Sequence, residues 1–96
     1  MTAYIISRIR VTDEDRFAQY RAASMPVAEK YGAQYLARSE EIEVLDGHDD
    51  GRRLVIISFP DMDKLKAFWN SEDYQAARRL RLDAAEIDIV ALPGLS

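Results

Sequence analysis

Apolar and polar residues alternate between Tyr4 and Val11 with the two-residue period of a β-strand. One face of this segment carries Ile5, Ser7, Ile9 and Val11, and the other carries Tyr4, Ile6, Arg8 and Arg10. The alternation predicts a first strand over these residues.

The segment from Leu54 to Phe59 differs because it is apolar on both faces. A half-buried strand alternates apolar and polar residues, whereas an unbroken Leu/Val/Ile run indicates a strand packed on each side. A chain of 96 residues has one modest core, and we expect a single layer of helices to cover one side of this strand. The other side must then meet a second subunit or a ligand.

Two helical patterns separate the strands. The first follows Thr12, whose hydroxyl is expected to cap the helix with Asp15 three residues later, and it ends at Gly32. Pro26 interrupts its interior and is expected to bend it around the sheet. Its apolar stripe consists of Phe17, Tyr20, Val27, Ala28 and Tyr31.

The second helical pattern starts after Pro60-Asp61 and breaks at Asn70-Ser71. Ser71 is a suitable N-cap for a second helical piece with acidic residues in its first turn. The buried side of the first piece is predicted to consist of Met62, Leu65, Phe68 and Trp69, and that of the second piece of Tyr74, Ala77, Leu80 and Ala84.

Two further strands complete the pattern. Residues 34–45 are β-prone, and their polar middle, residues 38–41, indicates a bulge, a strand that crosses the rim of the sheet, or a ligand-facing patch. Residues 46–51 are turn-forming and predict a hairpin with the apolar strand. A closing strand is predicted over residues 87–92.

The predicted order is βαββαβ in one domain over residues 1–96. Such an order usually forms the ferredoxin-like α+β fold, a four-stranded antiparallel sheet with two helices on one face. The bare face would carry Ile6, Val90, Leu92 and one phase of residues 54–57, an apolar patch larger than monomers usually expose. We therefore expect a homodimer that pairs two sheets face to face about a two-fold axis.

Composition and charge narrow the function classes. The chain is 48% hydrophobic and 31% charged, and no apolar run approaches the roughly 20 residues of a membrane span. Residues 1–6 lack the features of a secretory signal, so a cytoplasmic location is expected. A net charge of −4 disfavours nucleic acid as a partner. The absence of cysteine excludes disulfides and thiolate chemistry.

Several segments together resemble the domain-of-unknown-function family DUF1330, over nearly the whole chain. These are Thr12-Asp13, Ala28-Glu29-Lys30-Tyr31-Gly32, Tyr35-Leu36-Ala37-Arg38, Glu43-Val44-Leu45-Asp46-Gly47, Phe59-Pro60, Trp69-Asn70-Ser71-Glu72-Asp73-Tyr74-Gln75-Ala76-Ala77 and Leu80-Arg81. The resemblance implies the dimeric α+β barrel superfamily, whose members join two ferredoxin-like sheets and often hold small ligands between sheet and helices. It implies no reaction.

Arg38 is the first candidate binding residue. A guanidinium on a strand amid apolar positions requires a carboxylate or an anionic ligand to offset its desolvation. Two interpretations follow: an internal ion pair with Glu40 or another acid, or an anchor for the carboxylate of a small acid in a barrel cavity.

An aromatic group forms the second candidate. Tyr20, Phe68, Trp69 and Tyr74 are expected either to pack as core or to line a pocket between helix and sheet, with the break at Asn70-Ser71 at its mouth. Tyr74 is a candidate proton donor. Ser71 is a candidate hydrogen-bond donor to a ligand, or only a helix cap. Arg81 is expected to reach the same cavity or the surface.

His48 is the only histidine and lies in the turn-forming segment. The acids around it lack the spacing of a calcium loop, so we interpret residues 46–51 as a solvated hairpin tip. There is no catalytic triad, glycine-rich phosphate loop or histidine cluster, and we therefore expect neither a metal nor a cofactor. A haem-degrading function would use Trp69, Asn70 and His48, but His48 lies in the wrong kind of segment for an axial ligand.

Two functions remain. The first is a homodimer that binds a small carboxylate or aromatic ligand. The second is a cofactor-independent enzyme of the monooxygenase, isomerase or dehalogenase kind acting on an aromatic or carboxylated substrate, with Arg38 orienting the substrate and Tyr74 or His48 moving a proton.

Overall fold

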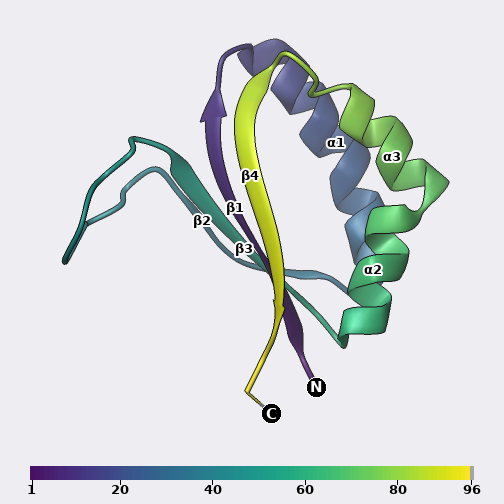
Figure 1. The fold of residues 1–96 in the computed structure, drawn as a ribbon. Helices are drawn as coiled ribbons and strands as arrows, with labels where there is room; N and C mark the ends of the chain where they lie inside the picture. Colours follow the sequence, from purple (N-terminus) through teal and green to yellow (C-terminus); the bar gives the residue numbers. More distant parts are fainter. Residues whose placement is uncertain (96) are drawn as a thin grey trace.

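The protein folds into one antiparallel sheet covered on one side by helices (Figure 1). The computed structural model describes residues 1–95. Its elements are β1 (Ala3–Val11), α1 (Glu14–Lys30), β2 (Gln34–Ser39), β3 (Arg53–Phe59), α2 (Met62–Asn70), α3 (Glu72–Arg79) and β4 (Ala85–Pro93). The strand order β2-β3-β1-β4 confirms the predicted ferredoxin-like α+β fold.

The two faces of the central strand β1 lie in different surroundings. Ala3, Ile5, Ser7 and Ile9 are buried beneath the helices, as the alternation predicts. They lie beside Val55 and Ile57 of β3, which belong to the same core. Since both neighbouring strands run antiparallel to β1, alternate residues of all three strands form one continuous floor under α1 and α2.

Helix α1 begins one residue later than predicted. Asp13 is its N-cap, because the Asp13 carboxylate accepts a hydrogen bond from the Arg16 amide over 3.1 Å. Thr12 instead donates its own amide to the carbonyl of Ala84. The predicted stop at Gly32 is confirmed: its φ is +88°, and a Cβ there would lie 2.8 Å from the Pro60 ring.

The predicted break between the two helical pieces is confirmed at Ser71. The Ser71 hydroxyl accepts a hydrogen bond from the Tyr74 amide and donates one to the carbonyl of Phe68. The prediction for the end of α3 was wrong in part. Because α3 stops at Arg79, Leu80 lies exposed, while Ala84 is buried beyond the helix.

Strand β2 is shorter than predicted and ends at Ser39. Residues 40–52 form an arm that projects from the body of the molecule (Figure 1). The predicted hairpin between this strand and the apolar strand is confirmed, because β2 and β3 pair antiparallel. Its connection spans residues 40–52 and is longer than the predicted turn at residues 46–51. The bulge lies at Leu36, between Tyr35 and Ala37, rather than at residues 38–41.

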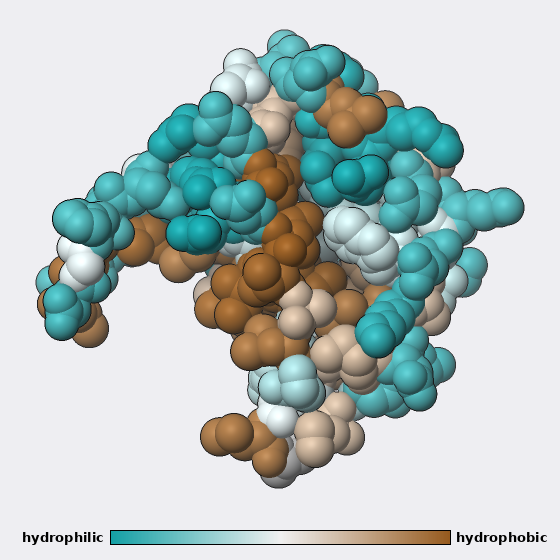
Figure 2. Space-filling model, in the orientation of Figure 1, coloured by the Kyte–Doolittle hydropathy of each residue, from teal (hydrophilic) through white to brown (hydrophobic). Residues whose placement is uncertain are grey.

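The face of the sheet opposite the helices carries an apolar belt, formed by Tyr4, Ile6, Ile56, Val90 and Leu92. Val90 is 57% exposed and Leu92 is 40% exposed. Figure 2 shows hydrophobic side chains gathered in a band along the sheet, between the hydrophilic arm and the helices. The predicted apolar surface is therefore present.

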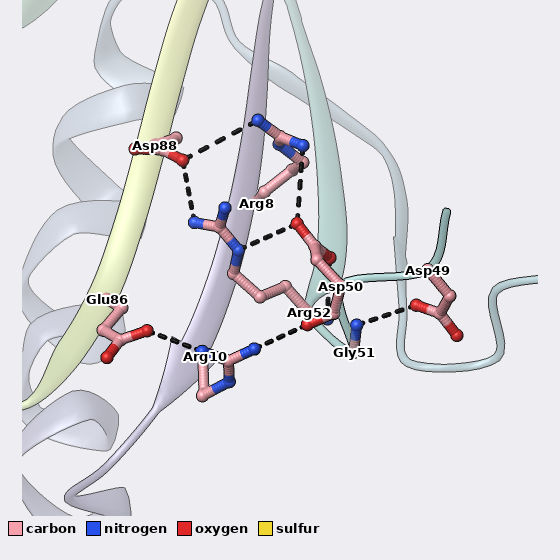
Figure 3. Close-up of polar contacts among 8 residues, drawn as sticks. All are labelled: Arg8, Arg10, Asp49, Asp50, Gly51, Arg52, Glu86 and Asp88. Atoms are coloured by element: carbon pink, nitrogen blue, oxygen red, sulfur yellow. Dashed lines mark hydrogen bonds and ion pairs between the residues drawn. The ribbon is translucent and has the colours of Figure 1, made fainter. Parts of the chain in front are cut away.

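Charged residues lie on this face beside the belt and hold the base of the arm (Figure 3). Arg52 pairs with Asp88 of β4 at 2.8 Å and with Asp50 at 3.0 Å. Arg10 pairs with Glu86 at 2.7 Å. The pKa of Asp50 is lowered, chiefly by the hydrogen bond from the Arg52 amide. These contacts hold the arm against β1 and β4.

Candidate ligand-binding cavity

A cavity lies between α1 and the helix-covered face of the sheet. Its outer compartment opens to solvent and encloses about 440 Å³, open mouth included. Its floor is formed by β1 and β3 and its roof by α1, while β2 forms the side. Its lining consists of Ser7, Ile9, Phe17, Tyr20, Arg21, Ser24, Met25, Tyr35, Arg38, Arg53, Val55 and Ile57.

An inner compartment continues from the outer one towards α2 and α3. Without the space open to solvent, its volume is about 30 Å³, against about 50 Å³ for the outer compartment. The two share five lining residues: Ser7, Tyr20, Ser24, Tyr35 and Ile57. Phe68, Trp69 and Tyr74 close its far end. The two compartments therefore form one cavity with a cationic mouth and an aromatic interior.

Three guanidinium groups surround the mouth. Arg53 is neutralised by Glu40 at 2.7 Å and by Glu14 at 3.7 Å. The expected pair between Arg38 and Glu40 is therefore wrong. Arg38 lies opposite the buried Val55, on the helix-covered side of β2, because the bulge at Leu36 shifts the register.

Arg21 and Arg38 have no acidic partner. No carboxylate within residues 1–95 lies within ion-pair distance of either guanidinium. Both line the outer compartment, one from α1 and the other from β2. They present two positive charges with fork geometry to anything that enters the mouth.

A pair of tyrosines marks the boundary between the compartments. The hydroxyl oxygens of Tyr20 and Tyr74 lie 3.1 Å apart, and the ring of Trp69 packs on Tyr74 with centroids 5.0 Å apart. Burial raises the pKa of Tyr20, and Tyr74 raises it further, while the positive charge of Arg81 partly opposes this shift. Burial also raises the pKa of Tyr35. Neutral phenols of this kind donate hydrogen bonds at neutral pH.

Four of the eight predicted site residues line this cavity: Tyr20, Arg38, Trp69 and Tyr74. Arg81 is only 9% exposed and lies behind them, with its guanidinium 5.3 Å from the Tyr20 ring centroid. Asn70 and Ser71 lie outside the lining. His48 lies in the arm, above a hollow on the opposite face of the sheet.

Sequence reasoning missed Ser7, Arg21, Ser24 and Tyr35 as lining residues. Signals for three of them were present. Arg21 and Ser24 stand four and seven residues after Phe17, on the same face of α1. Ser7 was visible as the polar residue on the buried face of β1. Within residues 1–95 no three metal-ligating side chains of His, Cys, Asp or Glu cluster together.

Residues 2–95 match the family described as a domain of unknown function, DUF1330. The chain belongs to the DUF1330 family. This confirms the resemblance read from the sequence. No match to a curated protein was found.

Solved structures with the same fold show which architectures this DUF1330 protein shares. A protein of unknown function from Rhodopseudomonas palustris has a TM-score of 0.79 at 18% identity, covering 99% of this chain and 83% of its own. A dimeric ferredoxin-like protein of unknown function from Jannaschia has a TM-score of 0.72 at 14% identity, covering 98% and 100%.

A third similar structure is SnoaB, a cofactor-independent oxygenase from Streptomyces nogalater. Its TM-score is 0.67 at 10% identity, covering 99% of this chain and 94% of its own. Identities this low establish a common fold alone.

Among the helices that the structure describes, none is long and apolar enough to cross a membrane.

Proposed function

We propose that this DUF1330 protein binds a small carboxylic acid with an aromatic body in the cavity beneath α1. The observation that carries the proposal is the pair Arg21 and Arg38, which lie at the mouth without an acidic partner. Arg38 is exposed and Arg21 is half-buried, so water solvates both guanidinium groups, and a ligand carboxylate would replace that water through charge-assisted hydrogen bonds. The aromatic side chains of the interior then pack against the apolar body of the ligand.

The experiment that tests this function is isothermal titration calorimetry with benzoate. Arg38→Gln should weaken binding about tenfold or more, because one charge-assisted hydrogen bond contributes roughly 1.5–3 kcal/mol. Arg16→Gln is the matched control, since Arg16 is an exposed arginine of α1 outside the cavity lining and the change in net charge is the same. Equal loss of affinity in the two variants, or no benzoate binding to the wild type, would contradict the proposal.

A second candidate is a cofactor-independent oxygenase acting on an aromatic acid. Two observations favour it: SnoaB shares the fold, and the hydroxyls of Tyr20 and Tyr74 meet inside the cavity. Arg38 would orient the carboxylate of such a substrate, and the tyrosine pair would donate a proton to a developing oxyanion. Oxygen consumption that depends on both the aromatic acid and Tyr74 would distinguish this activity from simple binding.

We also propose that a second copy of the chain covers the apolar belt. The exposed Val90 and Leu92 support this, because a monomer would leave them in water. The dimeric description of the Jannaschia protein, which has the same fold, is a further support. Such a dimer leaves the helix-covered cavity of each subunit on the opposite side of its sheet.

A further inference from the structure

Ser7 and Ser24 face each other across the cavity with unused hydrogen-bonding capacity. Each is only 5% exposed, and each lines both compartments. Neither hydroxyl forms a hydrogen bond with another group within residues 1–95. Within residues 1–95 the fully enclosed side-chain polar atoms that lack a partner are Arg78 Nε and Arg81 Nε, so the Ser7 and Ser24 hydroxyls are reached from the cavity and can bond a polar group inside it.

The pair of Tyr20 and Tyr74 provides one more hydroxyl hydrogen without an acceptor. Tyr20 and Tyr74 carry two hydroxyl hydrogens, but their single mutual contact at 3.1 Å uses only one of them. No aspartate or glutamate lines either compartment to accept the other hydrogen. Each of the four interior hydroxyls, those of Ser7, Ser24, Tyr20 and Tyr74, can donate one hydrogen bond and can also accept, so the interior can bind a ligand oxygen, while the mouth holds cations. Both ends of the cavity favour an oxygen-bearing ligand that accepts hydrogen bonds.

We infer that the natural ligand is an aromatic acid with a second oxygen function, a hydroxyl or a keto group, on the side of the ring away from the carboxylate. Arg21 and Arg38 hold the carboxylate at the mouth. Ser7 and Ser24 hold the second oxygen, with the free hydroxyl hydrogen of the tyrosine pair. This inference rests on the proposed function and extends it from a carboxylate site to a site with two polar ends.

The test compares benzoate with 2-, 3- and 4-hydroxybenzoate by calorimetry on the wild-type protein. Either 3- or 4-hydroxybenzoate, whose hydroxyl lies away from the carboxylate, should bind about tenfold more tightly than benzoate, because a site built to hydrogen-bond a ligand oxygen discriminates against the analogue that lacks it. A preference for 2-hydroxybenzoate alone would contradict the inference. The variant Ser7→Ala/Ser24→Ala should abolish this preference, so that it binds benzoate and the hydroxybenzoate about equally tightly.

Ser58→Ala is the matched control. Ser58 is a buried serine of β3 whose side chain lies on the opposite face of the sheet, and this substitution should leave the preference intact. The ratio of the two affinities is measured within each variant, so a change in the folded fraction does not alter it. Tyr20→Phe, which removes one hydroxyl of the pair, should reduce the preference without removing it.

Two further results would overturn the inference while leaving the proposed function in place. One is equal binding of benzoate and all three hydroxybenzoates by the wild type. The other is an equal loss of benzoate and hydroxybenzoate affinity in the double serine variant, which would indicate a structural role for the serines. Failure of all four acids to bind would instead overturn the proposed function and this inference with it.

Discussion

Tyr20 connects the chemistry of the cavity with the packing of the helices. Its ring packs on Phe17 with centroids 5.3 Å apart, its hydroxyl meets Tyr74, and the guanidinium of Arg81 lies over its face. The buried Arg81 Nε has no hydrogen-bond partner, so the face of Tyr20 is one of the few compensations for this buried charge. Removing the ring would leave a cavity, and it would also remove the contact that offsets the burial of the Arg81 guanidinium.

The pKa of Tyr20 predicts an alkaline limit to stability. Its folded pKa lies above the ordinary 10.0, so the folded state holds the proton more tightly than the unfolded state. Stability attributable to Tyr20 is therefore fully present below pH 10 and falls as the pH rises further. We expect tyrosinate absorbance from Tyr20 to appear only with unfolding, and Tyr20→Phe to lessen the alkaline loss of stability measured by urea denaturation. Titration of all five tyrosines as ordinary exposed phenols would contradict this.

At the scale of elements, the break between α2 and α3 positions the inner end of the cavity. Ser71 ends one helix and starts the next, so Trp69 lies in the last turn of α2 and Tyr74 in the first turn of α3. Their rings meet because the chain turns at Ser71. The cap therefore fixes the aromatic wall although Ser71 itself does not line the cavity.

Substitution of Ser71 tests this role. Ser71→Ala should lower the free energy of unfolding by about 1 kcal/mol, because the Tyr74 amide loses its capping acceptor. Ser71→Asp should retain most of the stability, since aspartate caps helices about as well as serine. Urea denaturation followed by circular dichroism measures both variants. Equal destabilisation by the two substitutions would show that capping is not what Ser71 contributes.

The sequence was sufficient for the elements with strong local signals. Periodicity gave the order of strands and helices, and Gly32 and Ser71 mark helix boundaries because their backbone or side chain satisfies specific terminal groups. The extent of β2 could not be predicted, because it depends on where β3 starts pairing. The bulge at Leu36 is likewise a property of the strand pair.

The cavity was predictable only in part for the same reason. Arg38 and the aromatic residues stood out by type, but no local pattern specifies the register in which Glu40 pairs with Arg53 and leaves Arg38 without an acid. Ser7 and Ser24 lie 17 positions apart in the sequence, and only the packing of α1 on β1 brings them to one cavity. The sequence therefore indicates which chemical groups the cavity contains better than it indicates which residues line it.

At the scale of the whole molecule, the sheet separates the two surfaces to which we assign the proposed functions. Its helix-covered face holds the cavity, and its open face carries the apolar belt beside a network of charges (Figures 2 and 3). The charged residues satisfy one another within the subunit, as in the pairs made by Arg10 and Arg52. The apolar belt has no such partner within the subunit, so the proposed association of two subunits involves the belt.

Sedimentation equilibrium tests the proposed dimer. The wild type should sediment at twice the 11.0 kDa chain mass, and Val90→Lys should sediment as a monomer, because it places a charge at the most exposed residue of the belt. Ala76→Lys, on the exposed side of α3, should remain dimeric. A wild type that sediments only as an 11.0 kDa monomer at micromolar concentration would contradict the assembly.

The most direct measurement of the central claim is a crystal structure with 4-iodobenzoate, in which anomalous scattering locates the iodine independently of the protein density. We expect the iodine inside the cavity, near Tyr20 and Tyr35, and the carboxylate within hydrogen-bond distance of Arg38. Iodine found only on the open face of the sheet, or an empty cavity at saturating ligand, would contradict the claim that the unpaired arginines and the hollow behind them form one carboxylate-binding site.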